Sequence, residues 1–275
     1  KLFPPQLGSQ RHRLYRERSK KMKSKTIVLI HGLFMNAKSW TDWKTYFERE
    51  GYKVVVPEFP FHNGEPATLR KNIPAGLGTL NLEDVLVHME KVVKEQAEPP
   101  ILIGHSIGGL VVQLLINRGL GAMGVSIDPA PPKGVFTTKW SFLKANIATI
   151  NPFKGNSPCL PSVEWFQYAF CNTMTMAETQ KLYDAFDVPE GRNIPRQSTK
   201  NAGKVDWNKA HAPLLIIAGE KDIIIPPSLN RKNFERYRPN GSKLDFKEFP
   251  GRTHMLCAQE GWQEIAGYIN TWIQE

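Results

Sequence analysis

The chain has 275 residues, of which 41% are hydrophobic and 23% charged, and its formal net charge is +10. This composition is typical of a globular protein and excludes an extended disordered, collagen-like or coiled-coil chain. The length suffices for one large domain, or for one domain with an insertion. No apolar run approaches the roughly 18 residues of a membrane-spanning helix, so we expect a soluble protein without a membrane span.

The positive charge is concentrated at the N-terminus. Residues 1–25 contain nine Lys or Arg and a single Glu, whereas the remaining 250 residues are nearly neutral, at +2. We interpret residues 1–25 as a solvated basic arm, or as one that holds a short edge strand at residues 12–18. Binding of this arm to anionic lipid or nucleic acid is the alternative, but no nucleic-acid partner is expected for the nearly neutral remainder.

The three cysteines, Cys159, Cys171 and Cys257, have no C-x-x-C spacing. They therefore predict neither a disulfide framework nor a zinc cluster, and they fit a reducing compartment such as the cytoplasm. No histidine motif typical of metal enzymes occurs, so we expect no metal. Neither the compartment nor the oligomeric state follows from these features.

From residue 26 onward, short apolar runs alternate with helical patterns. The predicted strands cover residues 26–30, 52–57, 100–104, 124–128, 214–219 and 244–249. The predicted helices of this alternation cover residues 39–50, 82–96, 107–118, 227–237 and 261–273. Apolar strands that alternate with amphipathic helices predict an α/β fold with a mostly parallel, doubly wound sheet.

One long interval interrupts this alternation. Residues 133–205 contain aromatic-rich helical patterns at 140–150, 162–170 and 176–186, and a polar stretch then continues to residue 211. We interpret residues 133–205 as a helical cap over the carboxyl end of the sheet, inserted into a core formed by residues 26–132 and 206–275. Helices that only thicken the core are the alternative.

The segment Gly104-His105-Ser106-Ile107-Gly108 follows an apolar strand and opens an apolar helix. A serine in such a tight turn presents its hydroxyl at the edge of the sheet, as a nucleophile does. The backbone N–H of Ile107, at the helix N-terminus, is a candidate donor to an oxyanion.

A serine nucleophile needs a base, and the base needs an acid that orients it. Asp222 follows the strand at 214–219, and His254 follows the strand at 244–249. The chain order is therefore Ser106, Asp222, His254, and all three are predicted to lie at carboxyl ends of strands.

Together with His31-Gly32-Leu33-Phe34 after the first strand, these motifs resemble serine hydrolases of the α/β-hydrolase superfamily, over residues 26–275. The resemblance implies a sheet of about six to eight strands, a helical cap inserted after the sixth strand, and no cofactor. It also implies that the N–H of Leu33, or alternatively of Phe34, is the second oxyanion donor. The N-terminal strand pair of that family is hard to find in residues 1–25. The motif set is most similar to cap-bearing esterases and to the related cofactor-free perhydrolases and C–C hydrolases.

Several residues compete for these roles. Asp128, at the end of the strand before the insertion, is the alternative acid, while Glu220 is expected to be a solvated or capping carboxylate. Cys257 is expected to be a buried thiol and Trp40 a helix anchor. The histidines other than His254 are expected to be structural or exposed, with His31 ordering the oxyanion loop and His105 supporting the elbow: His12, His31, His62, His88, His105 and His211.

These residues predict a serine hydrolase that cleaves a small to medium, partly hydrophobic ester or lactone, with this small molecule as its partner. The alternatives are a perhydrolase, a C–C hydrolase, a hydroxynitrile lyase and a ligand-binding relative with little turnover. We expect an apolar pocket under the cap, with Phe34, Trp140, Trp165 and Phe166 as its candidate lining.

Overall fold

The computed structural model describes residues 24–275, so the prediction of an edge strand at residues 12–18 lies outside the described residues. Its sheet has six parallel strands in the order β2-β1-β3-β4-β5-β6. The strands are β1 (Thr26–Ile30), β2 (Lys53–Val55), β3 (Ile101–His105), β4 (Met123–Ile127), β5 (Leu214–Gly219) and β6 (Leu244–Phe249). The predicted parallel α/β sheet and all six predicted strands are confirmed.

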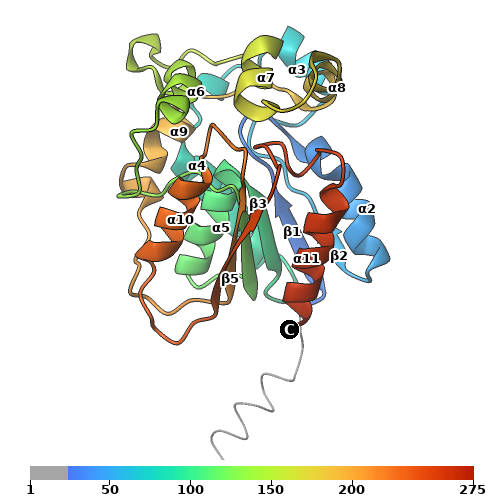
Figure 1. Cartoon of the computed structure of the whole chain (residues 1–275), viewed down its shortest axis with the longest axis vertical. Coiled ribbons are helices and arrows are strands. Elements are labelled where there is room, and N and C mark those ends of the chain that lie inside the picture. Colours follow the sequence, from blue (N-terminus) through green and yellow to red (C-terminus); the bar gives the residue numbers. More distant parts are fainter. Residues whose placement is uncertain (1–23) are drawn as a thin grey trace, which may run out of the picture.

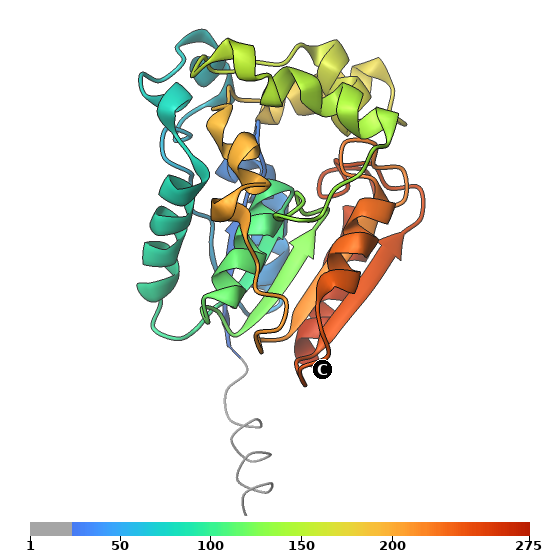
Figure 2. The ribbon, with the colours of Figure 1, turned by 90° about the vertical axis from the view of Figure 1, so that its left-hand side faces the viewer.

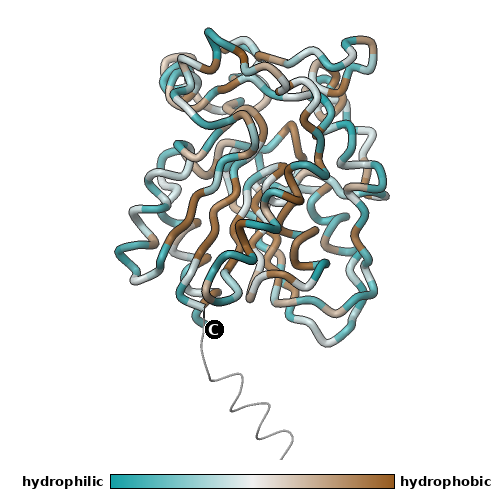
Figure 3. The backbone as a smooth tube through the Cα atoms, turned by 180° about the vertical axis from the view of Figure 1, so that it is seen from behind, coloured by the Kyte–Doolittle hydropathy of each residue, from teal (hydrophilic) through white to brown (hydrophobic). Residues whose placement is uncertain are grey.

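The strands form a parallel sheet because helices bury both of its faces. β1 is buried along its whole length, and its side chains alternate between two cores: Ile27 and Leu29 belong to one, Val28 and Ile30 to the other. Figure 3 shows the strands as the most hydrophobic part of the backbone.

Helices cover the two faces of the sheet, as Figure 1 and Figure 2 show. α2 (Thr41–Arg49) and α11 (Trp262–Gln274) pack on the core that contains Ile27 and Leu29. α4 (Leu82–Lys94), α5 (Ile107–Asn117) and α10 (Pro227–Arg236) pack on the opposite core. These five helices confirm the predicted alternation. No helix within residues 24–275 combines the length and the apolar character needed to cross a membrane.

The insertion follows β4, which is the fourth strand that the structure describes, whereas the resemblance implied the sixth. Its helices are α6 (Trp140–Ile150), α7 (Val163–Phe170), α8 (Met176–Phe186) and α9 (Asn193–Ser198). Figure 1 shows α6, α7 and α8 across the carboxyl ends of the strands.

Several short helices were not predicted. They are α3 (Pro66–Lys71) and α9, together with the 3₁₀ turns η1 (Ala37–Trp40), η2 (Leu77–Thr79), η3 (Pro152–Lys154) and η4 (Asn201–Gly203). Only η1 overlaps a predicted helix, the one over residues 39–50, and only at its last two residues. Elements of three to six residues are too short to show an apolar period, so sequence patterns do not reveal them.

A buried ion pair joins the insertion to the loop after β2. His62 and Glu190 are each only 1% exposed, and Nε2 of His62 lies 3.0 Å from Oε2 of Glu190. Nδ1 of His62 lies 2.9 Å from the carbonyl oxygen of Pro60, so both ring nitrogens face acceptors and the imidazolium satisfies both. Burial opposes this charge, but the carboxylates of Glu190 and Glu58 and the Pro60 carbonyl outweigh burial and raise the pKa of His62.

We expect this pair to stabilise the fold in a pH-dependent way. Because the pKa of His62 is raised in the folded state, its contribution is complete below the unfolded pKa of about 6.5 and is lost as pH rises through the folded pKa. His62→Gln should therefore lower the free energy of unfolding by about 2 kcal/mol or more near pH 6, and by clearly less near pH 9. Urea unfolding at both pH values measures this difference, and an equal loss at both would contradict the account.

Candidate active site

Ser106 occupies a strained turn between β3 and α5. Its φ of 57° lies in a region that residues other than glycine rarely adopt, and its N–H donates to the carbonyl of Ile127 over 2.9 Å. A Cβ on Gly104 would lie 2.2 Å from the Gly108 carbonyl oxygen, and one on Gly108 would lie 2.3 Å from that of Ile30. The elbow therefore needs glycine on both sides of Ser106 in order to present the serine at the carboxyl end of the sheet.

Two loops bring the predicted base and acid to this serine. Nε2 of His254 lies 3.0 Å from Oγ of Ser106, and Nδ1 of His254 lies 2.6 Å from Oδ2 of Asp222. The loop after β5 carries Asp222, and the loop after β6 carries His254. All three side chains are buried. The structure thus brings together the three residues that the sequence singled out, although they are separated by up to 148 positions.

The hydrogen bonds define the tautomer of His254. The carboxylate of Asp222 accepts the proton of Nδ1, which leaves the lone pair of Nε2 directed at the hydroxyl of Ser106. Burial lowers the pKa of His254 to about 3, so the ring is neutral at physiological pH and can accept the serine proton. The ring of Phe170 packs edge-on against His254, with their centroids 4.8 Å apart, and helps to hold it.

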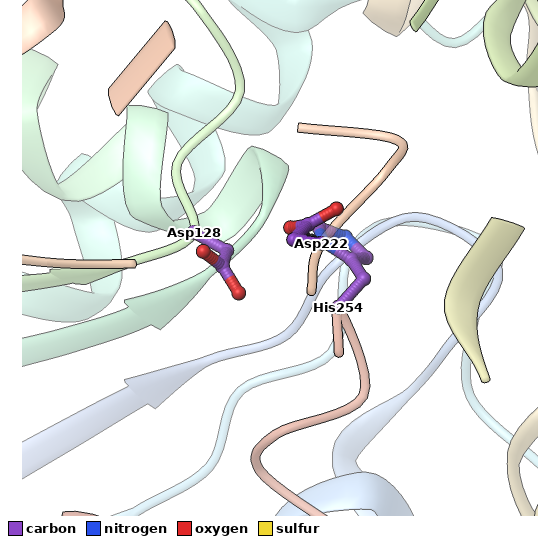
Figure 4. A group of neighbouring side chains, drawn as sticks. All are labelled: Asp128, Asp222 and His254. Carbon is purple, nitrogen blue, oxygen red and sulfur yellow. Dashed lines mark hydrogen bonds and ion pairs between the residues drawn. The ribbon is translucent and has the colours of Figure 1, made fainter. Parts of the chain in front are cut away.

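Asp128, the alternative acid, lies close to this pair but does not contact His254 through a hydrogen bond. Figure 4 shows it facing Asp222 and His254 from the end of β4. Its Oδ1 accepts hydrogen bonds from the Gly219 N–H (2.8 Å) and from the side chain of Asn230 (3.3 Å). The geometry therefore favours Asp222 as the partner of the imidazole.

The two buried carboxyl groups share one environment. Burial and the neighbouring Asp222 raise the pKa of Asp128 well above its usual value. Burial also raises the pKa of Asp222, but the Ile225 N–H, which donates to its Oδ1 over 2.8 Å, and a proton on Asp128 oppose this shift. Two carboxyl groups with oxygens within 4.8 Å of each other cannot both be ionised at low cost. We infer that Asp128 carries the proton and that Asp222 is the ionised member.

Asp128, Asp222 and His254 are also the one group in residues 24–275 that offers three metal-ligand atoms within 4.8 Å of one another. Within this group, Nδ1 of His254 and Oδ2 of Asp222 already contact each other. Cys159, Cys171 and Cys257 are buried and free.

The loop after β1 brings Leu33 and Phe34, the two candidates for the second oxyanion donor, beside the serine. Leu33, Phe34 and Ile107 line the same cavity as Ser106. His31 orders this loop, because its Nε2 accepts from the Phe59 N–H over 3.0 Å while Nδ1 contacts the Gly32 carbonyl at 2.8 Å. Burial lowers the pKa of His31 to about 3, so it is neutral. His105 supports the opposite side, with its Nε2 2.8 Å from the carbonyl oxygen of His254.

A cavity of about 140 Å³ opens on Ser106. Its walls are mostly apolar, and they come from the oxyanion loop, the elbow, the loops after β4 and β5, and the helices α6, α7 and α9. The lining residues are Leu33, Phe34, Ser106, Ile107, Ala130, Pro131, Phe142, Asn146, Thr149, Ile150, Phe170, Pro195, Ser198, Thr199, Ile224 and Ile225.

Of the four aromatic residues predicted to line the pocket, only Phe34 does so. Trp165 packs edge-on against Phe34, and Phe166 stacks on Phe170, so both support the wall from behind. The prediction for Trp140 was wrong, because its side chain is 75% exposed on the far side of α6. The lining residues of α6 and α9 were missed, since the periodicity of α6 predicts a helix without indicating which face turns inward.

Comparisons with solved structures show the same architecture. A monoacylglycerol lipase from Paleococcus ferrophilus superposes with a TM-score of 0.67 at 20% identity, over 90% of this chain and 93% of that one. A methylesterase from Arabidopsis matches with a TM-score of 0.64 at 13% identity, over 91% and 99% of the two chains. A pyrethroid hydrolase from Sphingobium faniae matches with a TM-score of 0.64 at 16% identity, over 91% and 97%.

The family assignment comes from the sequence. A search of curated proteins found no match. A sequence model of the alpha/beta hydrolase family, in contrast, matches residues 27–267, which include the elbow, Asp222 and His254. The chain therefore belongs to the alpha/beta hydrolase family.

Proposed function

We propose that this protein is a serine hydrolase that cleaves a carboxylic ester through Ser106, His254 and Asp222. One observation carries the proposal: the hydroxyl of Ser106, the imidazole of His254 and the carboxylate of Asp222 form a continuous chain of contacts of 3.0 Å and 2.6 Å. Three buried groups in this order are what activation of a serine requires. The relatives described above, a lipase, a methylesterase and a pyrethroid hydrolase, support an ester as the substrate.

The first half of the reaction forms an acyl-enzyme. Oγ of Ser106 attacks the carbonyl carbon of the ester while its proton passes to Nε2 of His254. The N–H groups of Leu33 and Ile107 stabilise the negative charge on the tetrahedral oxygen. When the C–O bond breaks, His254 returns the proton to the departing alkoxide, which leaves as an alcohol.

The second half repeats these steps with water. His254 removes a proton from water as the oxygen attacks the acyl carbon, and it then protonates Oγ of Ser106 as the acid product leaves. Asp222 holds the imidazole in the required tautomer and stabilises the imidazolium in both halves.

The cavity predicts which acyl groups fit. Its volume of about 140 Å³ and its mostly apolar walls suit a small to medium acyl chain under the helices of the insertion, which we propose to act as a cap. Acetyl and butyryl groups should therefore react well, whereas a decanoyl group should exceed the space that the walls of α6 leave.

We expect kcat/KM for p-nitrophenyl esters to fall by about tenfold or more from butyrate to decanoate. Thr149→Phe, which fills part of the cavity from α6, should move the optimum to a shorter chain. Val87→Phe, on an exposed position of α4, is the matched control and should leave the profile unchanged. Equal rates on every chain length would contradict the pocket proposed here.

A further inference from the structure

α6 turns one face toward the cavity and leaves a second, apolar face uncovered. Phe142, Asn146 and Thr149 turn toward the cavity. On the opposite face, residues spaced three and four apart point into solvent, and Phe153 of η3 continues this surface. We call them the α6 patch, and their side chains are 75%, 43%, 66%, 39% and 96% exposed: Trp140, Leu143, Ile147, Ile150 and Phe153.

This exposure is not the result of a loose helix end. Arg196 donates a hydrogen bond of 2.6 Å to the carbonyl of Gly155 and another to that of Asn151, and Arg192 donates to that of Ala148. The two arginines therefore fix the carboxyl end of α6 and the turn after it. The solvent-facing side of a surface helix is normally polar. An apolar side on a helix that is held in place, as α6 is, is typical of an interaction surface.

The charge around the patch indicates what the partner is. Residues 129–163 contain four lysines and no Asp or Glu, and all four lysines are exposed: Lys133, Lys139, Lys144 and Lys154. A surface with the opposite charge complements them. The N-terminal residues 1–23 hold eight Lys or Arg and one Glu, so that segment of the chain has the same sign as the patch and does not complement it.

Exposed Trp, Phe, Leu and Ile on a helix bordered by lysines are the features of a helix that lies in a lipid interface. The aromatic rings enter the headgroup region, and the lysines attract anionic lipids. Ile150 belongs both to the patch and to the cavity wall, so the patch extends to the cavity that holds Ser106.

We propose that the α6 patch docks this protein on an anionic lipid surface. The helix lies in the interface and does not cross the bilayer, and no helix in residues 24–275 is suited to crossing. On the proposed function, docking would place the cavity beside short-chain esters that partition into that surface.

Vesicle binding tests the docking without any turnover. The full chain should sediment with vesicles of phosphatidylcholine and phosphatidylglycerol, and only weakly with phosphatidylcholine alone. The variant Trp140→Ser/Ile147→Ser/Phe153→Ser should bind the mixed vesicles at least about tenfold more weakly. Because all three side chains are exposed, thermal unfolding of the variant should match that of the parent.

Two further variants separate the contributions. Ile147→Ser alone should weaken binding, whereas its matched control Val87→Ser, a similarly exposed position on α4, should not. Lys139→Glu/Lys154→Glu should remove most of the preference for anionic vesicles.

Undiminished binding of the triple variant would overturn the proposal and assign lipid binding to the basic N-terminal segment. Failure of the parent chain to bind either vesicle would overturn it as well. A self-association that sedimentation velocity detects, and that the triple variant abolishes, would instead make a second copy of this chain the partner. Loss of hydrolysis in Ser106→Ala bears on the proposed function alone, because this substitution leaves the patch intact.

Discussion

Replacing Ser106 with alanine should lower kcat for p-nitrophenyl butyrate by about four to six orders of magnitude. The substitution removes the atom that forms the acyl-enzyme, while the cavity, the oxyanion donors and the contact between His254 and Asp222 remain. Binding of substrate should therefore change little. Steady-state kinetics, corrected for hydrolysis of the substrate without enzyme, measure the residual rate.

Ser198→Ala is the matched control for this experiment. Ser198 lines the same cavity, but its hydroxyl donates to the carbonyl of Pro195 over 2.9 Å and does not contact His254. We expect kcat for Ser198→Ala to stay within about tenfold of the parent. If Ser106→Ala kept a comparable rate, another residue would have to be the nucleophile.

The second large effect separates the two buried carboxyl groups. Asp222→Asn should lower kcat by about four orders of magnitude, because an amide in this position no longer holds Nδ1 of His254 protonated and Nε2 free. Asp128→Asn should lower kcat by no more than about tenfold. An asparagine side chain can accept from the Gly219 N–H as Asp128 does, and the substitution leaves the contact between Asp222 and His254 in place.

A larger loss of kcat in Asp128→Asn than in Asp222→Asn would instead make Asp128 the acid that orients His254. A large loss in both variants, with unchanged thermal unfolding, would mean that the two carboxyl groups act as one unit and that the proton on Asp128 is needed for activity. Each substitution exchanges an oxygen for a nitrogen of similar size, so changes in packing contribute little to the comparison.

The sheet was predictable from sequence because its central strands, β1, β3, β4 and β5, are buried on both faces. Runs such as Thr26–Ile30 and Leu214–Gly219 are almost entirely apolar, and turn residues bound each of them. Parallel strands share one carboxyl edge, so the loops that carry Ser106, Asp222 and His254 had to converge there. The hydrogen bonds between these residues then follow from the fold.

The pocket was less predictable, because the aromatic content of a helix does not indicate which of its side chains turn toward the cavity. Large apolar residues occur on both faces of α6, so its sequence pattern predicts a helix but not that Phe142 turns inward and Trp140 outward. In α7, Trp165 and Phe166 support the wall without reaching the cavity. α9 supplies Pro195 and Ser198 from six residues, a length too short to show a period.

No pattern in the sequence predicts the ion pair of His62 and Glu190. The two residues are 128 positions apart, and both lie outside the helices and strands of the sheet. Only the packing of the insertion against the loop after β2 brings the carboxylate to the imidazole. Contacts of this kind depend on tertiary structure, and no local pattern encodes them.

The most direct test of the central claim is covalent labelling with a fluorophosphonate, followed by peptide mass spectrometry. We predict one adduct per chain, on the peptide that contains Ser106, and a labelling rate that falls steeply in His254→Ala while Ser198→Ala reacts like the parent. No adduct, or an adduct that persists unchanged in Ser106→Ala, would contradict a serine nucleophile activated by His254 and would favour a ligand-binding relative with little turnover.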